Sequence, residues 1–339
     1  MNKLRILALV HRHLVPPEDT AGVDASAADW KMEHDVTATL RKCGHEVKIL
    51  GVQKDLAAIG ACAEEFKPNI VFNLLENFDD VTTFDQNVVS HLELMRLSYT
   101  GCNPRGLMLA RDKALSKQLL AYHRIPVPDF VVVRRGRKPV LGKRLKFPLI
   151  VKSLFFEASA GISQASVVEN DEQLTKRVQF IHDSLGTAAI VERFIDGREL
   201  YVGVLGNERV QVFPVWEMTF EKMPENTYRI ATERVKWNTR YQQKHGIETH
   251  QAKLPNGVGE RIQHLVKRAY RVLDLSGYAR LDLRLDTRGK VYVLEANPNP
   301  QLAYGEDFAE SGKRAGLSYD RLLERIVGLG LQWQPERTG

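Results

Sequence analysis

Apolar runs alternate with amphipathic segments over the first hundred residues. Three of these runs, RILALV (5–10), HEVKILGV (45–52) and NIVFNLLE (69–76), have the composition of strands, and a short fourth, SYTG, follows at 98–101. Helical periodicity favours helices between them, at about 25–43, 55–66 and 85–95. Strands that alternate with helices form parallel sheets, so this pattern predicts an α/β unit with a small parallel sheet.

The pattern changes beyond residue 112. Asp112 is suited to cap a helix that ends near His123, and the stiff run Ile125–Pro128 then connects this helix to a new unit. We expect short strands in this unit at 130–133, 147–153, 165–168 and 188–195, with a helix at 171–185. In a third part, from about Asp196, we expect strands at 199–207 and 211–217, a polar excursion at 222–252, helices at 258–273 and 319–328, and a hairpin at 278–300.

The expected hairpin, YARLDLRLDTRGKVYVLEANPNP, carries the most informative polar residues of the chain. Successive side chains of a strand point to opposite faces, so Arg280, Asp282 and Arg284 share one face. The leucines between them are left for the core. The first strand of the hairpin therefore predicts one apolar face and one strongly polar face.

The segment 286–289 joins the two strands of the hairpin. It is polar and ends in glycine, which is a hairpin signal between two β-rich runs. If the two ends of this segment face each other, Asp282 lies opposite Val293 and Arg280 lies opposite Glu295. The polar groups of both strands then converge on one face.

Glu295 and Asn297 share that face with Asp282. Two carboxylates on a half-buried strand face are costly unless a cation neutralises them, and oxygen ligands of this kind suit magnesium better than zinc. The alternative is that Asp282 and Arg284 are solvated on an edge strand while Glu295 pairs with Arg280. The prolines that follow Asn297 favour the metal site, because they stop the strand with its polar groups at the tip.

Composition limits the class of protein. The chain has 339 residues, 43% of them hydrophobic and 27% charged, as expected for a globular protein of two or three domains. The net charge of +6 is modest and the basic residues look dispersed, so we expect no nucleic-acid partner. Three widely spaced cysteines and no apolar run of membrane length predict reduced thiols, a cytoplasmic location and no membrane partner.

A second group of residues is suited to phosphates. Lys152 ends an apolar strand and is followed, after a gap, by the small residues Ser159–Gly161, whose backbone N–H groups can approach phosphates closely. Lys113 and Lys236 are candidates for further phosphate contacts. The alternative for each is an ordinary solvated lysine, and for the loop a plain turn.

The run 192–199 joins two expected strands through a turn. A link of this kind can present backbone groups to an adenine, with Glu199 placed for the ribose hydroxyls. The alternative is that Glu199 forms a salt bridge with an arginine.

Taken together, these residues resemble the ATP-grasp superfamily, and within it the D-alanine:D-alanine ligase-like branch. The resemblance covers nearly the whole chain and rests on Tyr99–Gly101, Asp112–Lys113, Pro148–Lys152 with Ser159–Gly161, Glu192–Glu199, Lys236–Trp237 and Arg280–Asn297.

The resemblance implies a three-domain ATP-grasp architecture: a Rossmann-like domain at 1–112, a central subdomain at 113–195 and a C-terminal subdomain with the metal hairpin at 196–330. It also implies an ATP-dependent carboxylate:amine ligase that acts on small amino acids or peptides. In that reaction the carboxylate attacks the γ-phosphate of ATP, and the amine then displaces phosphate from the acyl phosphate. Homodimers are common in similar ligases, so one is expected here by analogy.

The resemblance further implies a role for each residue of the site. The nucleotide contacts would be Lys113, Lys152, Glu192, Phe194, Glu199 and Lys236. Two magnesium ions, with manganese as an alternative, would be held by Asp282, Glu295 and Asn297. The catalytic residues would be Arg280, as oxyanion stabiliser, with Lys236 and Ser159. The amino-acid substrates would meet Glu76, Trp237, Asn299 and Gln301.

The chain departs from the D-alanine ligases where those enzymes select the amino acid. NLLENFDD fills the loop of a His-Gly-x-x-Gly-Glu-Asp type segment, Ala158–Ser159 replaces a serine pair, and Trp237 replaces a tyrosine. After Asn297 the chain has PNPQL in place of a Ser-Pro-Gly-Met type sequence. The substrate therefore stays open, as do two other functions: a kinase that phosphorylates a small acceptor, and a non-catalytic nucleotide sensor.

Overall fold

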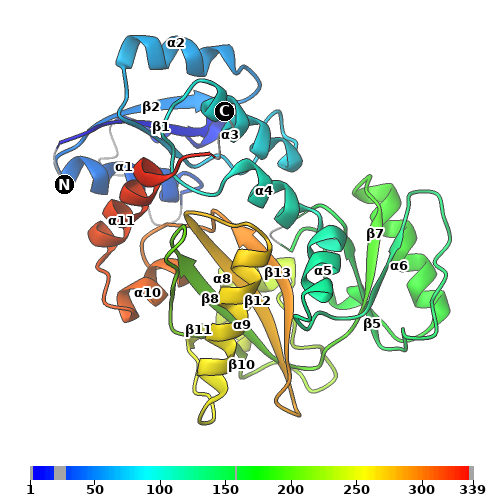
Figure 1. Cartoon of the computed structure of the whole chain (residues 1–339). Helices are drawn as coiled ribbons and strands as arrows, with labels where there is room; N and C mark the ends of the chain where they lie inside the picture. Colours follow the sequence, from blue (N-terminus) through cyan, green and yellow to red (C-terminus); the bar gives the residue numbers. More distant parts are fainter. Residues whose placement is uncertain (1–2, 19–27, 157–158, 336–339) are drawn as a thin grey trace.

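The computed structural model describes residues 3–18, 28–156 and 159–335. Three sheets follow one another along the chain, with three, four and six strands (Figure 1). The last helix, α11 (Tyr319–Gln332), returns to the first sheet, as the red ribbon beside α1 and the blue strands shows. This α/β architecture agrees with the fold class expected from the sequence.

The first sheet consists of β1 (Arg5–His11), β2 (Glu46–Val52) and β3 (Ile70–Asn73), all parallel, with β1 in the centre. Alternate residues of β1 enter two different cores: Leu7 and Leu9 pack on one side, Ile6 and Val10 on the other. Its helices and 3-10 turns are η1 (Arg12–Leu14), α1 (Lys31–Lys42), α2 (Ala57–Phe66), η3 (Thr82–Phe84), α3 (Asp85–Leu94) and α11 (Tyr319–Gln332). Helices cover both faces, so the predicted parallel sheet is confirmed.

The second sheet is antiparallel, with the order β4-β7-β5-β6. Its elements are β4 (Phe130–Val133), β5 (Leu149–Ser153), η4 (Gln164–Ser166), β6 (Val167–Val168), α6 (Asp171–Ser184) and β7 (Ala189–Arg193). Two helices lead to it from the first sheet, α4 (Pro104–Arg111) and α5 (Lys113–Tyr122). The Asp112 side chain accepts N–H bonds from Ala114 and Leu115, both 2.9 Å long, which confirms its predicted role as a helix cap.

The third sheet has the order β11-β10-β8-β12-β13, with β9 beside β8. Its strands are β8 (Gly197–Leu205), β9 (Gln211–Val212), β10 (Trp216–Phe220), β11 (Ile247–Gln251), β12 (Tyr278–Asp286) and β13 (Val291–Pro298). Its helices are α7 (Glu233–Trp237), α8 (Thr239–His245), α9 (Val258–Val272) and α10 (Asp307–Arg314). The buried side of α9 packs with the leucines of β12 in one core.

Several elements differ from the sequence expectations. The polar excursion at 222–252 contains α7, α8 and β11, and neither α4 nor α10 was expected. These helices have only five to eight residues, too few for a clear 3.6-residue period. The segment SYTG is no strand, because its Tyr99 forms only an isolated bridge with Val71. The first helix begins at Lys31, and part of its expected range, 25–27, lies outside the described residues.

No helix in the described part of the chain is both long enough and apolar enough to cross a membrane.

The register of the metal hairpin corrects the one expected from the sequence. Asp282 lies opposite Glu295, not Val293, and Arg280 lies opposite Asn297, not Glu295. One residue of the difference comes from the turn and one from a bulge after Asp282, where β13 has an extra residue. Side chains alternate between the two faces of a strand, so a total shift of two residues returns each side chain to its original face. The expected polar groups therefore still share one face.

The leucines of β12 also behave as expected. Leu281 and Leu283 are fully buried and Leu285 nearly so. Asp282 and Arg284 are buried as well, each 4% exposed, because the opposite face of β12 is covered too. The alternative of a solvated edge strand is therefore wrong: β12 lies between β8 and β13.

Gly277, the residue just before β12, packs directly against the backbone of Gly101, in the loop that follows the first sheet. Its φ is +67°, and an added Cβ would lie 2.4 Å from the carbonyl oxygen of Gly101. We predict that Gly277→Ala lowers the free energy of unfolding by roughly 3 kcal/mol, from backbone strain and backbone overlap together. Gly289→Ala is the matched control, since Gly289 has a φ of +78° but open space around its Cβ position; its expected cost is about 1 kcal/mol. Urea unfolding measures both, and equal losses would contradict the role of the Gly101 contact.

Candidate active site

A pocket opens between the second and third sheets. It encloses about 770 Å³, its open mouth included. Nine residues predicted for the site line it: Lys113, Lys152, Ser159, Glu192, Phe194, Glu199, Lys236, Asp282 and Glu295. The structure therefore brings together residues that are up to 182 positions apart along the chain, counted from Lys113 to Glu295.

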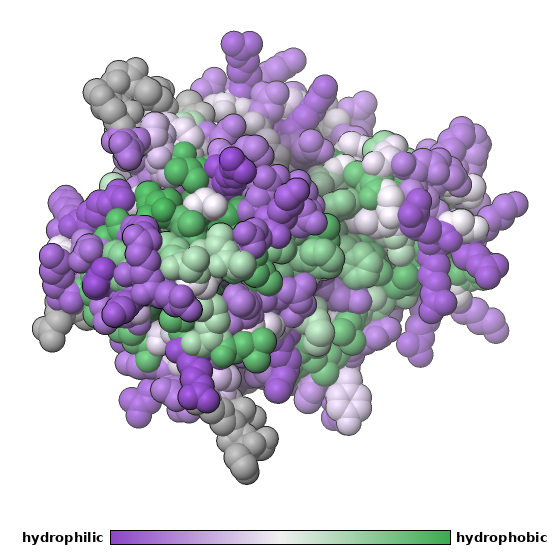
Figure 2. All heavy atoms as spheres, turned by 90° about the horizontal axis from the view of Figure 1, so that it is seen from above, coloured by the Kyte–Doolittle hydropathy of each residue, from purple (hydrophilic) through white to green (hydrophobic). Residues whose placement is uncertain are grey.

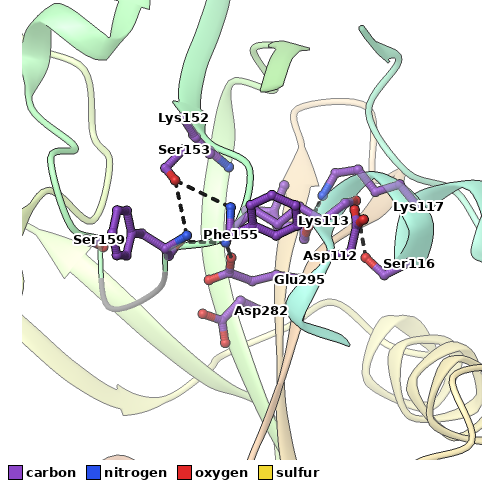
Figure 3. Close-up of polar contacts among 12 residues, drawn as sticks. Asp112, Lys113, Ser116, Lys117, Lys152, Ser153, Phe155, Ser159, Asp282 and Glu295 are labelled. Atoms are coloured by element: carbon purple, nitrogen blue, oxygen red, sulfur yellow. Dashed lines mark hydrogen bonds and ion pairs between the residues drawn. The ribbon is translucent and has the colours of Figure 1, made fainter. Parts of the chain in front are cut away.

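The two carboxylates of the hairpin lie side by side at this pocket. Figure 3 shows Asp282 and Glu295 between the strand that carries Lys152 and the helix that carries Lys113. Burial and the nearby Glu295 raise the pKa of Asp282. Burial opposes the charge of Glu295 too, but nearby lysines, first of all Lys113, outweigh it and lower its pKa to about 2. Glu295 is thus ionised while Asp282 resists ionisation beside it.

These residues fit a divalent cation. Asp282 and Glu295 lie directly opposite each other across the ladder, and Asn297, two residues beyond Glu295, adds a side-chain amide oxygen that can act as a further ligand. In the described ranges no three His, Cys, Asp or Glu side chains gather into a metal site. A donor set of two carboxylates and one amide suits magnesium, which takes its other ligands from water and phosphate.

Arg280 forms a salt bridge with the Asp282 carboxylate. Its Nε and Nη2 donate to the two carboxylate oxygens over 2.8 and 3.0 Å, and its guanidinium lies 4.8 Å from the ring centre of Tyr201. Each carboxylate oxygen keeps a further lone pair, so this bond leaves Asp282 able to bind a cation. Arg280 itself is not among the residues that line the pocket.

A buried charge network forms the wall opposite the hairpin. Lys117 Nζ and Lys152 Nζ each lie 3.1 Å from a different carboxylate oxygen of Glu192, whose side chain is fully buried. Burial opposes the charge of Glu192, but the two lysines outweigh it and lower the pKa of this residue below its ordinary value. The network thus holds two positive charges and one negative charge at the pocket.

Lys113 lies between that network and the hairpin. Its Nζ donates to the carbonyl of Phe156 over 2.7 Å and lies 3.9 Å from Glu295 Oε2. Burial, reinforced by the neighbouring lysines, lowers its pKa to about 8 although Glu295 favours its charge. Lys113 is therefore a cation that is short of negative partners.

Two segments at the pocket, one beginning at Ser159 and one containing α7, are hydrogen-bonded to each other. Ser159 Oγ donates to the carbonyl of Ala231 over 2.7 Å, and the Glu233 N–H donates to the carbonyl of Ile162 over 3.0 Å. The side chain of Gln164 exchanges two further bonds with the backbone of Tyr228. The segment 159–164 is thus joined to the residues 228–233 that lead into α7, while residues 157–158 lie outside the described structure.

Glu199 forms a salt bridge with an arginine, which was the alternative to a contact with the ribose. Its Oε2 accepts from Arg284 over 2.7 Å, and its Oε1 accepts from the hydroxyl of Tyr201 over 3.0 Å. The residue still lines the pocket, next to Phe194, whose ring packs edge-on against Tyr228 at 5.1 Å. The role of Glu199 towards a ribose stays a prediction.

The predicted substrate residues lie outside the pocket lining. Asn299 accepts the Cys102 N–H over 2.8 Å, and the side-chain oxygen of Gln301 accepts the Ala303 N–H over 3.3 Å. Glu76 is exposed after the end of β3, and Trp237 is 64% exposed at the end of α7. The Asn299 and Gln301 oxygens thus have structural partners, and the substrate role of all four residues remains untested.

Sequence reasoning missed two charged residues of the site. Lys117 belongs to the buried network, and its position four residues after Lys113 places both lysines on one face of α5, which is a signal the sequence did contain. Arg284 was placed on the polar face of β12, but its partner Glu199 lies 85 residues away on β8. No local pattern identifies such a pair.

The chain is similar to proteins of one family. A family model described as the D-ala D-ala ligase C-terminus matches residues 119–328. A D-alanine--D-alanine ligase of Desulforudis audaxviator is 30% identical over 87% of this chain and 90% of that protein. An uncharacterised protein, y4sG of Sinorhizobium fredii, is 31% identical over 88% of this chain and 86% of its own length.

Solved structures show the same fold. The D-alanine--D-alanine ligase of Bacillus anthracis complexed with ATP superposes with a TM-score of 0.75 at 20% identity, over 97% of this chain and 98% of that one. The VanG D-Ala:D-Ser ligase of Enterococcus faecalis gives 0.70 at 18% identity, over 97% and 100%.

We predict that binding of a triphosphate to this pocket weakens above pH 8. The free protein loses the charge of Lys113 as the pH rises through about 8, whereas a bound phosphate favours the protonated lysine. Affinity should then fall by at most about tenfold per pH unit between pH 8 and 9.5. Calorimetric titration with a non-hydrolysable ATP analogue measures this. Lys113→Arg is the control, since arginine stays charged and should flatten the profile; an equally steep profile in that variant would contradict the assignment.

Proposed function

This chain belongs to the D-alanine--D-alanine ligase family of ATP-dependent carbon–nitrogen ligases, and on that premise we propose that it joins the carboxyl group of one small amino acid or peptide to the amino group of another. The single observation that carries the proposal is the pairing of Asp282 with Glu295 at a pocket lined by Lys113, Lys152 and Lys236. Cations on one side and carboxylates on the other suit a metal-bound triphosphate.

We infer that Asp282, Glu295 and Asn297 hold magnesium. The bound ions would supply positive charge to the phosphate oxygens, which is the chemistry that the paired carboxylates alone cannot provide. Manganese, which also prefers oxygen ligands, is an alternative. The resemblance implies that these residues hold two ions.

The lysines of the pocket are proposed to position the triphosphate. Phosphoryl transfer needs in-line placement and positive charge around the transferred group, and Lys113, Lys152 and Lys236 can supply both. The substrate carboxylate attacks the γ-phosphate, ADP leaves, and an acyl phosphate forms. The amine then attacks the acyl carbon, phosphate leaves, and the amine loses its proton.

Arg280 is proposed to stabilise the oxyanion of the second step. It lies on the same face of β12 as Asp282, directly beside it, and it is held there by two hydrogen bonds. A fixed cation of this kind lowers the energy of a developing negative charge without first having to reorient. Ser159 supports the loop over the site through Ala231, which helps to exclude water from the acyl phosphate.

The partners are small molecules, as expected for this family. We propose a cytoplasmic enzyme, in keeping with the ATP that it consumes. The side chains of Glu76 and Trp237 are proposed to face the amino acids. The homodimer implied by the resemblance stays a prediction, which light scattering of the purified protein checks.

A panel of amino acids and dipeptides of both stereochemical series tests the reaction. With ATP and magnesium, ADP release should require both a carboxylate donor and an amine, and mass spectrometry should find an amide. A stable phosphorylated product without an amide would overturn the proposal in favour of a kinase. Binding of ATP with no turnover across the panel and across pooled metabolites would favour a nucleotide sensor.

We predict that Asp282→Asn lowers kcat by at least about a hundredfold, because it removes a carboxylate from the proposed metal site. Asp286→Asn is the control: it lies four residues along the same strand, with its side chain bonded to the turn residues Arg288 and Lys290. Its kcat should stay within about twofold of the parent protein, since Asp286 does not line the pocket. Full activity of Asp282→Asn would refute the metal assignment.

A further inference from the structure

A second groove lies away from the catalytic pocket, behind the metal hairpin. Its walls are the end of α5, the connector 125–129, the start of β4 and the segment Gly142–Leu145, and Lys290 of the hairpin turn closes one side. It encloses about 1460 Å³, its mouth included, compared with about 770 Å³ for the catalytic pocket measured in the same way. The groove is thus large enough for an organic ligand.

The groove has an apolar floor. Ile125 and Pro128 are buried, and Phe130, Val131 and Leu145 are partly buried. The connector is fixed to the hairpin, because the Val293 N–H donates to the carbonyl of Pro126 over 2.9 Å. A floor of this composition favours a ligand with an apolar body.

The rim of the groove is positively charged. Arg124, Lys143, Arg144 and Lys290 are exposed, and Asp129 is the one acid among the lining residues. Within the described ranges none of the four cations forms an ion pair; Lys290 lies over the ring of Tyr292 at 4.9 Å. Four cations against one acid are suited to a ligand with more than one negative charge.

The loop that supplies this rim extends the positive charge. Contrary to the expectation of dispersed basic residues, the segment 134–146 has no acidic residue and seven basic ones: Arg134, Arg135, Arg137, Lys138, Lys143, Arg144 and Lys146. Figure 2 shows hydrophilic side chains projecting from the end of the molecule that the second sheet occupies. The field of this loop would raise the local concentration of anions near the groove.

We propose that this groove binds an amphipathic organic anion, with an apolar body on the floor and at least two acidic groups at the rim. A nucleic acid fits the surface less well, because the floor offers only the partly buried ring of Phe130 for base stacking. The apolar floor argues against inorganic anions. The site is separate from the reaction proposed above, since no residue lines both the groove and the catalytic pocket.

The dye bis-ANS, which has an aromatic body and two sulfonates, serves as the probe. Its fluorescence titration with the full chain should reveal a site with a stoichiometry of one that saturating Mg-ATP does not compete for. Lys143→Glu combined with Arg144→Glu should weaken this site by about tenfold, because two rim charges are reversed. The control combines Lys313→Glu with Arg314→Glu, an exposed basic pair on α10, and should leave the affinity unchanged.

A second measurement does not depend on fluorescence. Trypsin cleaves after lysine and arginine, so the basic segment 134–146 is a natural target in the folded protein. Bound bis-ANS should slow cleavage there in the parent protein but not in the Lys143→Glu/Arg144→Glu variant. The uncharged analogue N-phenyl-1-naphthylamine should protect less, because it lacks the acidic groups.

Binding unchanged in the groove variant, displacement of the dye by Mg-ATP, or equal binding of the uncharged analogue would each overturn the proposal. Displacement by phosphatidylcholine vesicles that contain cardiolipin, which carries two phosphates, but not by pure phosphatidylcholine, would support the proposal and identify a lipid as the source of the anion. Displacement by soluble organic diphosphates alone would support it with a free metabolite as the source. A single-stranded oligonucleotide that displaces the dye more tightly than either would overturn it.

Discussion

The site depends on the cross-strand pairing of Asp282 on β12 with Glu295 on β13, the edge strand of the third sheet. Neither strand can supply two carboxylates at this spacing alone, and the bulge after Asp282 decides which residue of β13 lies opposite. Like charges placed directly across a ladder destabilise a sheet, so the pairing must be compensated. Arg280 compensates Asp282 through two hydrogen bonds, and Lys113 with its neighbouring lysines compensates Glu295. A functional requirement thus explains an arrangement that folding alone disfavours.

The same balance of charges links the helix α5 to two sheets. Lys113 and Lys117 share one face of α5, and they reach Glu295 on β13 and Glu192 on β7 respectively. The helix starts where Asp112 caps it, so the cap sets the position of both lysines. Removing water from these groups strengthens their interactions but makes any unpaired charge costly. Burial lowers the pKa of Lys113 to about 8, and an anionic ligand would favour the charged form of this lysine.

Alternation along the chain was sufficient to predict the parallel first sheet, the apolar face of β12 and the cap at Asp112, because each depends on residues close in sequence. The register of the hairpin was wrong by two positions, since neither a longer turn nor a bulge leaves a clear trace in the pattern. Arg284 could not be paired with Glu199 from the sequence, because the two strands meet only in the folded sheet. Most predictions that rested on spacing within one element agree with the structure, although SYTG is not a strand, whereas the pairing of residues between strands needed the fold.

The same difference explains why the resemblance to the D-alanine ligases is clear for the residues predicted to bind ATP but not for those predicted to bind the amino acids. The residues predicted for the nucleotide lie on a few strands and one helix, each with its own short pattern, so the sequence alone could indicate them. The other side involves loops from distant parts of the chain: the amide oxygen of Asn299 is bonded to Cys102, and that of Gln301 to Ala303. Their side chains stabilise the fold at the point where a substrate contact was expected. These bonds give Asn299 and Gln301 a structural role in the loop after β13, separate from the carboxylate pair of the hairpin.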